Sequence, residues 1–126
     1  MNANDPENQY AEDLLLERLS DVEERLERAC NRAGRPPDDV TLVAVSKTHP
    51  ARAIRTLARA GVERFGASYV QEWQDKVGDC PDDLCWHFVG HLQSNKAKYV
   101  ADEMEMIHSV DRRSVMKQLH RRSEGE

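Results

Sequence analysis

The sequence predicts a single α/β domain in which one long helix precedes four β-α units. Three observations support this prediction. A length of 126 residues suits one domain with its own core. Apolar runs alternate four times with helix-forming segments, and the first of these runs is continuously apolar, as in strands that are buried on both faces of a parallel sheet.

The long helix is expected over residues 10–33. Apolar residues recur at helical spacing from Leu15 to Cys30, and the other faces carry charges of both signs, several of them four residues apart. Gly34 and then Pro36-Pro37 end the run. The run is short for a coiled coil, so we favour a helix that packs on the domain over that alternative.

Four strand candidates follow, each with a helical stretch behind it. Pro50 and Gly61 delimit the first of these helices, Ser94 or Asn95 can cap the third, and Asp111 can cap the fourth. Regular β-α alternation predicts parallel strands joined by right-handed crossovers. The strand candidates are 40–46, 62–68, 84–90 and 104–110, and the helices behind them are 51–60, 69–77, 96–103 and 112–122.

Two architectures fit this alternation. One is an open, doubly wound sheet, and the other is part of a (β/α)8 barrel. A complete barrel takes ~250 residues, about twice the length of this chain. Composition and pattern alone leave both possibilities open.

Composition narrows the class of protein. A net charge of −5 argues against nucleic-acid binding, which needs a basic surplus, and the basic stretch 112–122 is an ordinary solvated helix face. No stretch approaches the ~20 apolar residues of a membrane helix. Three unevenly spaced cysteines favour a reducing cytoplasm. Residues 1–9 are polar, resemble neither a secretory nor a transit leader, and are expected to form a disordered tail before a single domain at 10–126.

Ligands of parallel α/β folds bind where strands end, so the residues that follow each strand are the site candidates. Lys47 stands out among these candidates. It closes an apolar run, where desolvation would favour a neutral, nucleophilic amine. The alternative is a lysine that reaches water and does nothing more. The four segments to inspect are 46–49, 65–69, 90–95 and 108–111.

A metal site is not expected. His87 and His91 lie four residues apart with Cys80 and Cys85 upstream, but the histidines fall on a strand and turn. The cysteine spacing is looser than that of most structural zinc sites, so buried thiols are the simpler interpretation.

Four segments, taken in order, resemble one family. They are Leu42-Val-Ala-Val-Ser-Lys-Thr48, Arg64-Phe-Gly-Ala-Ser-Tyr-Val-Gln-Glu72, Trp86-His-Phe-Val-Gly-His-Leu-Gln-Ser-Asn-Lys96 and Ile107-His-Ser-Val-Asp111. Together they are similar to the pyridoxal phosphate homeostasis proteins, which share the fold of the N-terminal barrel of alanine racemase. The resemblance implies a barrel that binds pyridoxal 5′-phosphate (PLP), a cytosolic carrier or buffer with no catalytic residue, and a Schiff base on Lys47. It also makes Ser68 and Leu92 cofactor-binding candidates.

The resemblance has two gaps. The family usually has Glu-Asn where this chain has Ala67-Ser68, so the hydroxyl of Ser68 would replace an asparagine near the cofactor. In the family, strands after the fourth supply the phosphate-binding residues and an arginine near the pyridine nitrogen. The chain therefore looks like the first half of the barrel, (β/α)4 behind its helix, with weakened cofactor binding.

Two other functions remain open at this point. One is a PLP-dependent racemase or decarboxylase, which would need a second acid–base group and a further domain. The other is a half-barrel remnant that oligomerises and has lost the cofactor. A half barrel exposes two strand edges and an apolar face, so pairing into a dimer is expected. The alternatives are a chain that swaps elements, one that is unstable alone, and a monomer whose N-terminal helix folds back over the open face. The side chains expected on that open face are Leu42, Ala44, Phe88 and Ile107.

Overall fold

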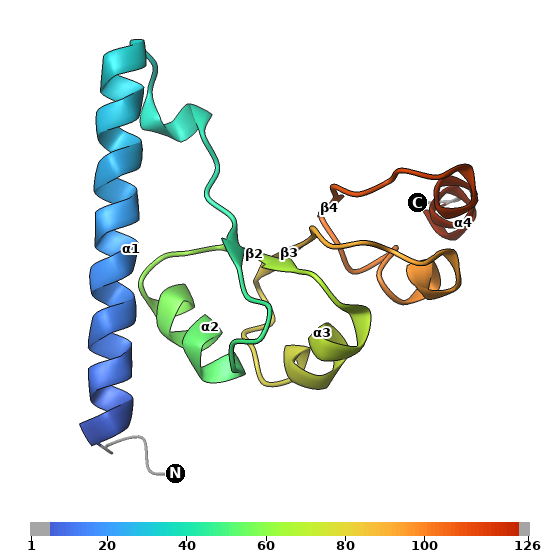
Figure 1. The fold of residues 1–126 in the computed structure, drawn as a ribbon, viewed down its shortest axis with the longest axis horizontal. Coiled ribbons are helices and arrows are strands. Elements are labelled where there is room, and N and C mark those ends of the chain that lie inside the picture. Colours follow the sequence, from blue (N-terminus) through green and yellow to red (C-terminus); the bar gives the residue numbers. More distant parts are fainter. Residues whose placement is uncertain (1–5, 124–126) are drawn as a thin grey trace.

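The computed structural model describes residues 6–123, and its elements follow the expected α/β order (Figure 1). A long helix leads into four short strands, and a helix or a 3-10 helix follows each strand. The half-barrel prediction of one helix and four β-α units is thereby confirmed. The elements are α1 (Pro6–Ala33), η1 (Pro37–Asp39), β1 (Ala44–Val45), α2 (Ala51–Arg59), β2 (Arg64–Ala67), α3 (Val70–Val77), β3 (Cys85–Phe88), η2 (Ser94–Tyr99), β4 (Met106–Ile107) and α4 (Arg113–Ser123).

The strands form one sheet in the order β1-β2-β3-β4, and all neighbours are parallel. Phe65 of β2 lies between Ala44 of β1 and Trp86 of β3. The strands are shorter than the seven-residue runs predicted from the sequence, and the two edge strands are the shortest. An apolar run signals burial, but the length of a strand depends on its hydrogen-bonded neighbours, and an edge strand has a neighbour on one side only.

The core lies between the sheet and the helices α2 and α3. The rings of Phe65 and Trp86 have centroids 6.0 Å apart, and Trp73 of α3 meets Trp86 edge-on at 6.2 Å. Ile54 of α2 and Phe88 of β3 are fully buried in the same cluster. These aromatic residues fix which face of the sheet is covered by helices.

The residues predicted for the open face of the sheet, the face that no helix covers, are wrong by one position along the strands. Phe88 is buried in the core, Ala44 and Ile107 pack against that core, and Leu42 is half-buried. A shift of one residue along a strand exchanges its two faces, and continuously apolar runs carry no alternation that would reveal the phase. The open face instead carries Val43, Val45, Gly66, His87 and Met106, as the register and the contacts of Gly66 indicate.

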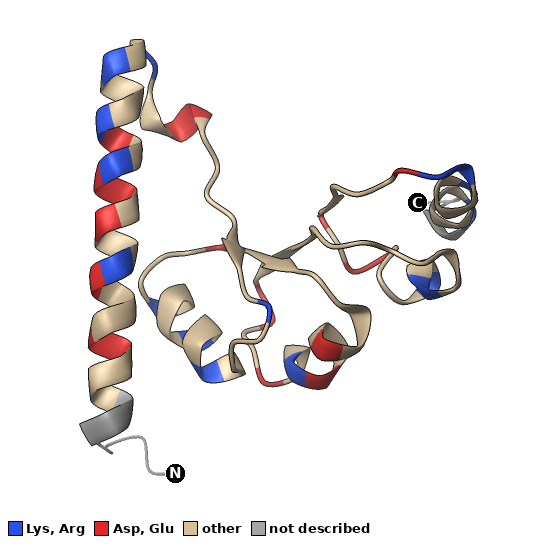
Figure 2. Ribbon diagram, in the orientation of Figure 1, with Lys and Arg blue, Asp and Glu red and all other residues tan. Residues whose placement is uncertain are grey.

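Helix α1 stands along one side of the domain, and its second half extends beyond it (Figure 1). It begins at Pro6, so the expected tail is at least four residues shorter, and residues 1–5 lie outside the described part. Glu12 pairs with Arg59 of α2 at 3.6 Å, and Leu19 packs against the core. Gly34, with φ +69°, ends the helix. Charges of both signs alternate along it (Figure 2).

The third β-α unit departs from the prediction. Instead of a helix over 96–103 the chain forms the 3-10 helix η2, whose N-cap position is Gln93 and lacks a side-chain cap. Neither Ser94 nor Asn95 caps a helix here. Ala97 and Val100 are fully buried with Val115 of α4, so packing against α4 holds this short turn. None of the helices within residues 6–123 is long and apolar enough to cross a membrane.

A polar network crosses the open face at β2, β3 and β4. The carboxylate of Glu105 accepts hydrogen bonds from the Arg64 guanidinium and from Nε2 of His87, each at 2.9 Å. The other ring nitrogen of His87 lies 2.9 Å from Nε2 of His108. Hydrogen bonds from His87, Cys85 and Arg64 lower the pKa of Glu105 from 4.5 to about 2. The network therefore holds an ionised carboxylate between three strands.

We predict that Glu105 links stability to acid pH. Its pKa is lower in the folded chain than in the unfolded chain, so its contribution is full above pH ~4.5 and disappears as the pH falls towards 2. Urea unfolding should show Glu105→Gln less stable than the parent chain at pH 7, with the gap closing at low pH. Glu103→Gln, at an exposed position two residues earlier, is the control. A gap that does not change between pH 7 and 3 would contradict this assignment.

Candidate functional site

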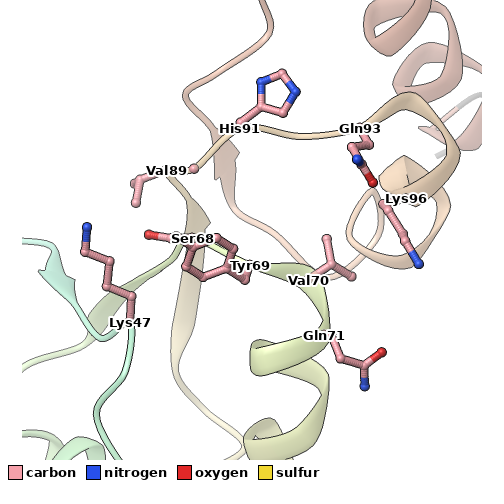
Figure 3. Close-up of a pocket in the computed structure, with 10 residues that line it drawn as sticks. Lys47, Ser68, Tyr69, Val70, Gln71, Val89, His91, Gln93 and Lys96 are labelled. Atoms are coloured by element: carbon pink, nitrogen blue, oxygen red, sulfur yellow. The ribbon is translucent and has the colours of Figure 1, made fainter.

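The ends of β1, β2 and β3 meet at a cavity of about 560 Å³. This volume is within the range of small-molecule sites, which is ~300–1,000 Å³. Parallel strands end at one edge of their sheet, so the segments that follow them gather there. Figure 3 shows the lining side chains, among them Lys47 after β1, Ser68 and Tyr69 after β2, and Val89, His91 and Gln93 after β3.

Lys47 stands at the β1 side of this cavity. It occupies a turn that is closed by a hydrogen bond of 3.1 Å from the His49 N–H to the Ser46 carbonyl. The side chain is exposed, so the expected desolvation of its amine is wrong. The short strand β1 ends before Lys47, and no apolar shell closes over the amine. Its position supports contact with a ligand in the cavity.

The segments that follow β2 and β3 form two walls of the cavity, and they touch each other at Ser68 and Gly90. A Cβ added at Gly90 would lie 2.1 Å from the Ser68 carbonyl oxygen and 2.7 Å from its Cα. Ser109, which follows β4, donates a hydrogen bond from its hydroxyl to the Gly90 carbonyl. Residues 108–111, the fourth segment predicted from the sequence, therefore contact the cavity wall without lining the cavity. Residues of the other three segments line it.

Leu92 does not belong to the cavity lining. Its side chain is fully buried in the core, while its carbonyl accepts a hydrogen bond from Arg112. The same guanidinium lies 3.0 Å from Nε2 of His91. Arg112 thereby fixes the loop after β3, and Leu92 anchors that loop from inside the core. The sequence motif placed Leu92 near the site but did not show which way it points.

The first turn of α3 forms another part of the wall, which the sequence did not single out. Val70 and Gln71 line the cavity, and Tyr69 at the N-cap makes no side-chain cap. The first backbone N–H groups of a helix have no partner within it, and they favour an anionic group. The ammonium of Lys96 points away from Lys47 and lies 5.6 Å from the Tyr99 ring (Figure 3). The wall therefore offers the amine of Lys47, hydroxyl and amide groups, and a helix N-terminus, with Lys96 on the far side of the cavity.

The cysteines and histidines considered for a metal do not converge. Cys80 is buried, which raises the pKa of its thiol, and His91 lies at the cavity. His87 and Cys85 both bond to Glu105, and that bond raises the pKa of Cys85. Within residues 6–123, no three His, Cys, Asp or Glu side chains form a group that could hold a metal ion.

Curated relatives share this sequence over most of its length. The pyridoxal phosphate homeostasis protein of Escherichia coli K12 is 40% identical over 110 residues, which are 84% of this chain and 47% of that protein. The corresponding protein of Aquifex aeolicus VF5 is 42% identical over 108 residues, which are 85% of this chain and 47% of that protein. The chain thus spans about half the length of these relatives. No family model matches the sequence.

Solved structures agree with this comparison. PipY of Synechococcus elongatus PCC7942 without PLP superimposes with a TM-score of 0.64 at 42% identity, covering 76% of this chain and 46% of PipY. PipY with PLP bound gives a TM-score of 0.61 at 43% identity, with the same coverage. An unknown protein from Bifidobacterium adolescentis gives a TM-score of 0.80 at 26% identity, covering 88% of this chain and 50% of that protein.

We predict that the cavity does not tolerate a side chain at Gly90. Gly90→Ala would press a methyl group into the Ser68 backbone, which cannot swing aside, so it should lower the free energy of unfolding by about 1–3 kcal/mol. Gly78→Ala is the control, because φ there is −65° and nothing lies within 4 Å of the added Cβ. That change should stabilise the chain by about 0.4–1 kcal/mol. Urea denaturation that ranks the two variants in the opposite order would refute this packing argument.

Proposed function

Because the chain is related to the pyridoxal phosphate homeostasis proteins over about half of their length, we propose that it binds PLP and takes part in PLP homeostasis without catalysing a reaction. The cavity at the ends of β1, β2 and β3 is the proposed binding site. Lys47 is the residue proposed to hold the aldehyde carbon, and Ser68 is a second contact. No catalytic residue is proposed.

The observation that carries this proposal is the placement of Lys47 at the cavity. PLP supplies an aldehyde that condenses reversibly with a primary amine. Within residues 6–123, no hydrogen bond or ion pair occupies the amine of Lys47, so it is available for such a bond. The uncapped N-terminus of α3 at the same wall suits an anionic group. The residues present therefore fit the cofactor.

Binding by this chain alone should be weaker than binding by the full-length relatives. The chain spans 47% of the E. coli protein, and the rest of that protein has no counterpart in these 126 residues. Phosphate groups are usually anchored by several backbone N–H groups and helix N-termini. One helix N-terminus and one lysine provide fewer contacts than a closed barrel would.

The same reasoning extends to compartment and partners. Cys30, Cys80 and Cys85 are free thiols, which suits a reducing cytoplasm, and we propose that location. The net charge of −5 speaks against a nucleic-acid partner. The proposed macromolecular partner is a second copy of this chain.

The open face of the sheet supports that pairing. Val45 of β1 is 50% exposed and Met106 of β4 is 52% exposed, and both lie on the face away from the helices. β1 and β4 are also the edges of the four-stranded sheet, with unpaired backbone groups. Two copies supply the eight strands of a closed barrel, and a two-fold axis is the commonest symmetry of such assemblies.

We predict a dimer in which Met106 is buried. Light scattering on a size-exclusion column should give twice the mass of the chain, and Met106→Glu should shift it to the monomer. Met116→Glu is matched in chemistry and exposure, since Met116 is 54% exposed, but it lies on α4 and should leave the dimer intact. A folded parent chain that runs as a monomer at micromolar concentration would reject the pairing.

We also predict that Lys47 is the lysine that bonds to PLP. Borohydride reduction makes that reversible bond permanent, and peptide mapping should place the pyridoxyl label on Lys47. Lys47→Ala should abolish the visible absorbance of the bound cofactor. Lys98→Ala, at an exposed position outside the cavity lining, should leave it unchanged. A label on Lys76, Lys96 or Lys98 in preference to Lys47 would refute the assignment.

A further inference from the structure

The turn that carries Lys47 has an unusual backbone. Ser46 and His49 close it by a hydrogen bond, with Lys47 and Thr48 at its corners. Thr48 has a φ of +65°, and it is the only residue other than glycine with a positive φ in the described part of the chain. Turns with a positive φ at the third position normally have Gly or Asn there. A β-branched residue in this region is strained and persists only where its surroundings enforce it.

Two side chains of α3 supply that enforcement. The ammonium of Lys76 donates hydrogen bonds to the Ser46 carbonyl at 2.7 Å, to the His49 carbonyl at 3.1 Å and to Glu72 Oε1 at 2.9 Å. Its three N–H donors thus have three acceptors. The Lys76 side chain is 12% exposed, and its bonds to Ser46 and Glu72 are partly buried. The two end residues of the turn, Ser46 and His49, are therefore both hydrogen-bonded to Lys76.

Glu72 fixes the corner of the turn. Its Oε1 accepts a hydrogen bond of 2.8 Å from the N–H of Thr48, the strained residue, while it also accepts from Lys76. The Lys76 hydrogen bond, with help from the Thr48 N–H, lowers the pKa of Glu72. The carboxylate is therefore ionised at neutral pH and holds both partners. Of the four turn residues, Lys47 alone is not bonded to α3.

We propose that Lys76 and Glu72 are positioning residues that hold the Ser46–His49 turn in its strained form, so that Lys47 projects into the cavity. This inference rests on the proposed function, because it assigns the pair a purpose in presenting the amine. The same helix begins at the cavity wall with Val70 and Gln71. α3 thus places one wall of the cavity and the turn opposite to it as a single unit.

The test removes the bonds of Lys76 and follows Lys47. Lys76→Met keeps the methylene chain and loses the ammonium, and we expect Lys47 to take the borohydride-fixed PLP label about tenfold more slowly than in the parent chain. Lys76→Arg, which keeps a charged donor, should recover part of that rate. Gln74→Ala is the control, since Gln74 is an exposed residue of the same helix that lies outside the cavity lining.

A second measurement needs no cofactor. In protein labelled with ¹³C-lysine, the side-chain Cε NMR signal of Lys47 should move in Lys76→Met but not in Gln74→Ala. Hydrogen exchange at the Thr48 amide should accelerate in the same variant. If Lys76→Met does not fold, Glu72→Gln, which keeps an acceptor for Thr48 but loses the charge, takes its place in both measurements.

The outcomes separate the two proposals. Equal PLP labelling and an unmoved Lys47 signal in the variants overturn the positioning role and leave PLP binding by the parent chain standing. If the parent chain takes no label on Lys47, the proposed function fails, and the positioning role is decided by the NMR signal and the Thr48 exchange. Slow labelling together with a moved signal and fast exchange supports both.

Discussion

Parallel pairing of β1, β2 and β3 is the constraint on which the rest of the structure depends. With Phe65 opposite both Ala44 and Trp86, the three strands end together, and the chain turns away from the sheet three times at one edge. Residues that are up to 49 positions apart in sequence, such as Lys47 and Lys96, thereby line one cavity. The strand pairs are only two to four residues long, so the aromatic cluster behind the sheet must hold this alignment.

Helix α3 connects that core to the cavity. Its buried face carries Trp73, which packs on Trp86, while Glu72 and Lys76 on another face hold the turn after β1. Residues four apart lie on the same side of a helix, which is why both can act on one turn. The eight residues of α3 thus contribute to the core, form part of one cavity wall and hold the turn that carries Lys47. Loss of helical structure here would disturb all three.

The sequence predicted the order of the elements, the parallel sheet and the segments that surround the cavity. It could do so because apolar runs and Gly or Pro boundaries are local signals, and because parallel strands end at a common edge. It did not predict the face of Phe88 or of Ala44, since continuously apolar strands hide their phase. Nor did it predict the hydrogen bond from the Lys76 ammonium to the carbonyl of Ser46, which lies thirty residues earlier in the chain. The spacing of Glu72 and Lys76 is visible in the sequence, but the acceptor of a tertiary hydrogen bond is not.

Any partner that covers the open face of the sheet must accommodate charged groups as well as apolar ones. Val45 and Met106 are exposed apolar residues of this face, which also carries the ionised Glu105 with Arg64 and His87. Arg64 and Glu105 form a neutral pair whose side chains remain 33% and 40% exposed. A purely apolar partner would leave these groups without water, which is costly for charges unless new hydrogen bonds replace it. In the proposed dimer, each copy would bring the same Arg64–Glu105 pair, which carries no net charge, so polar groups of one copy could replace the water around those of the other.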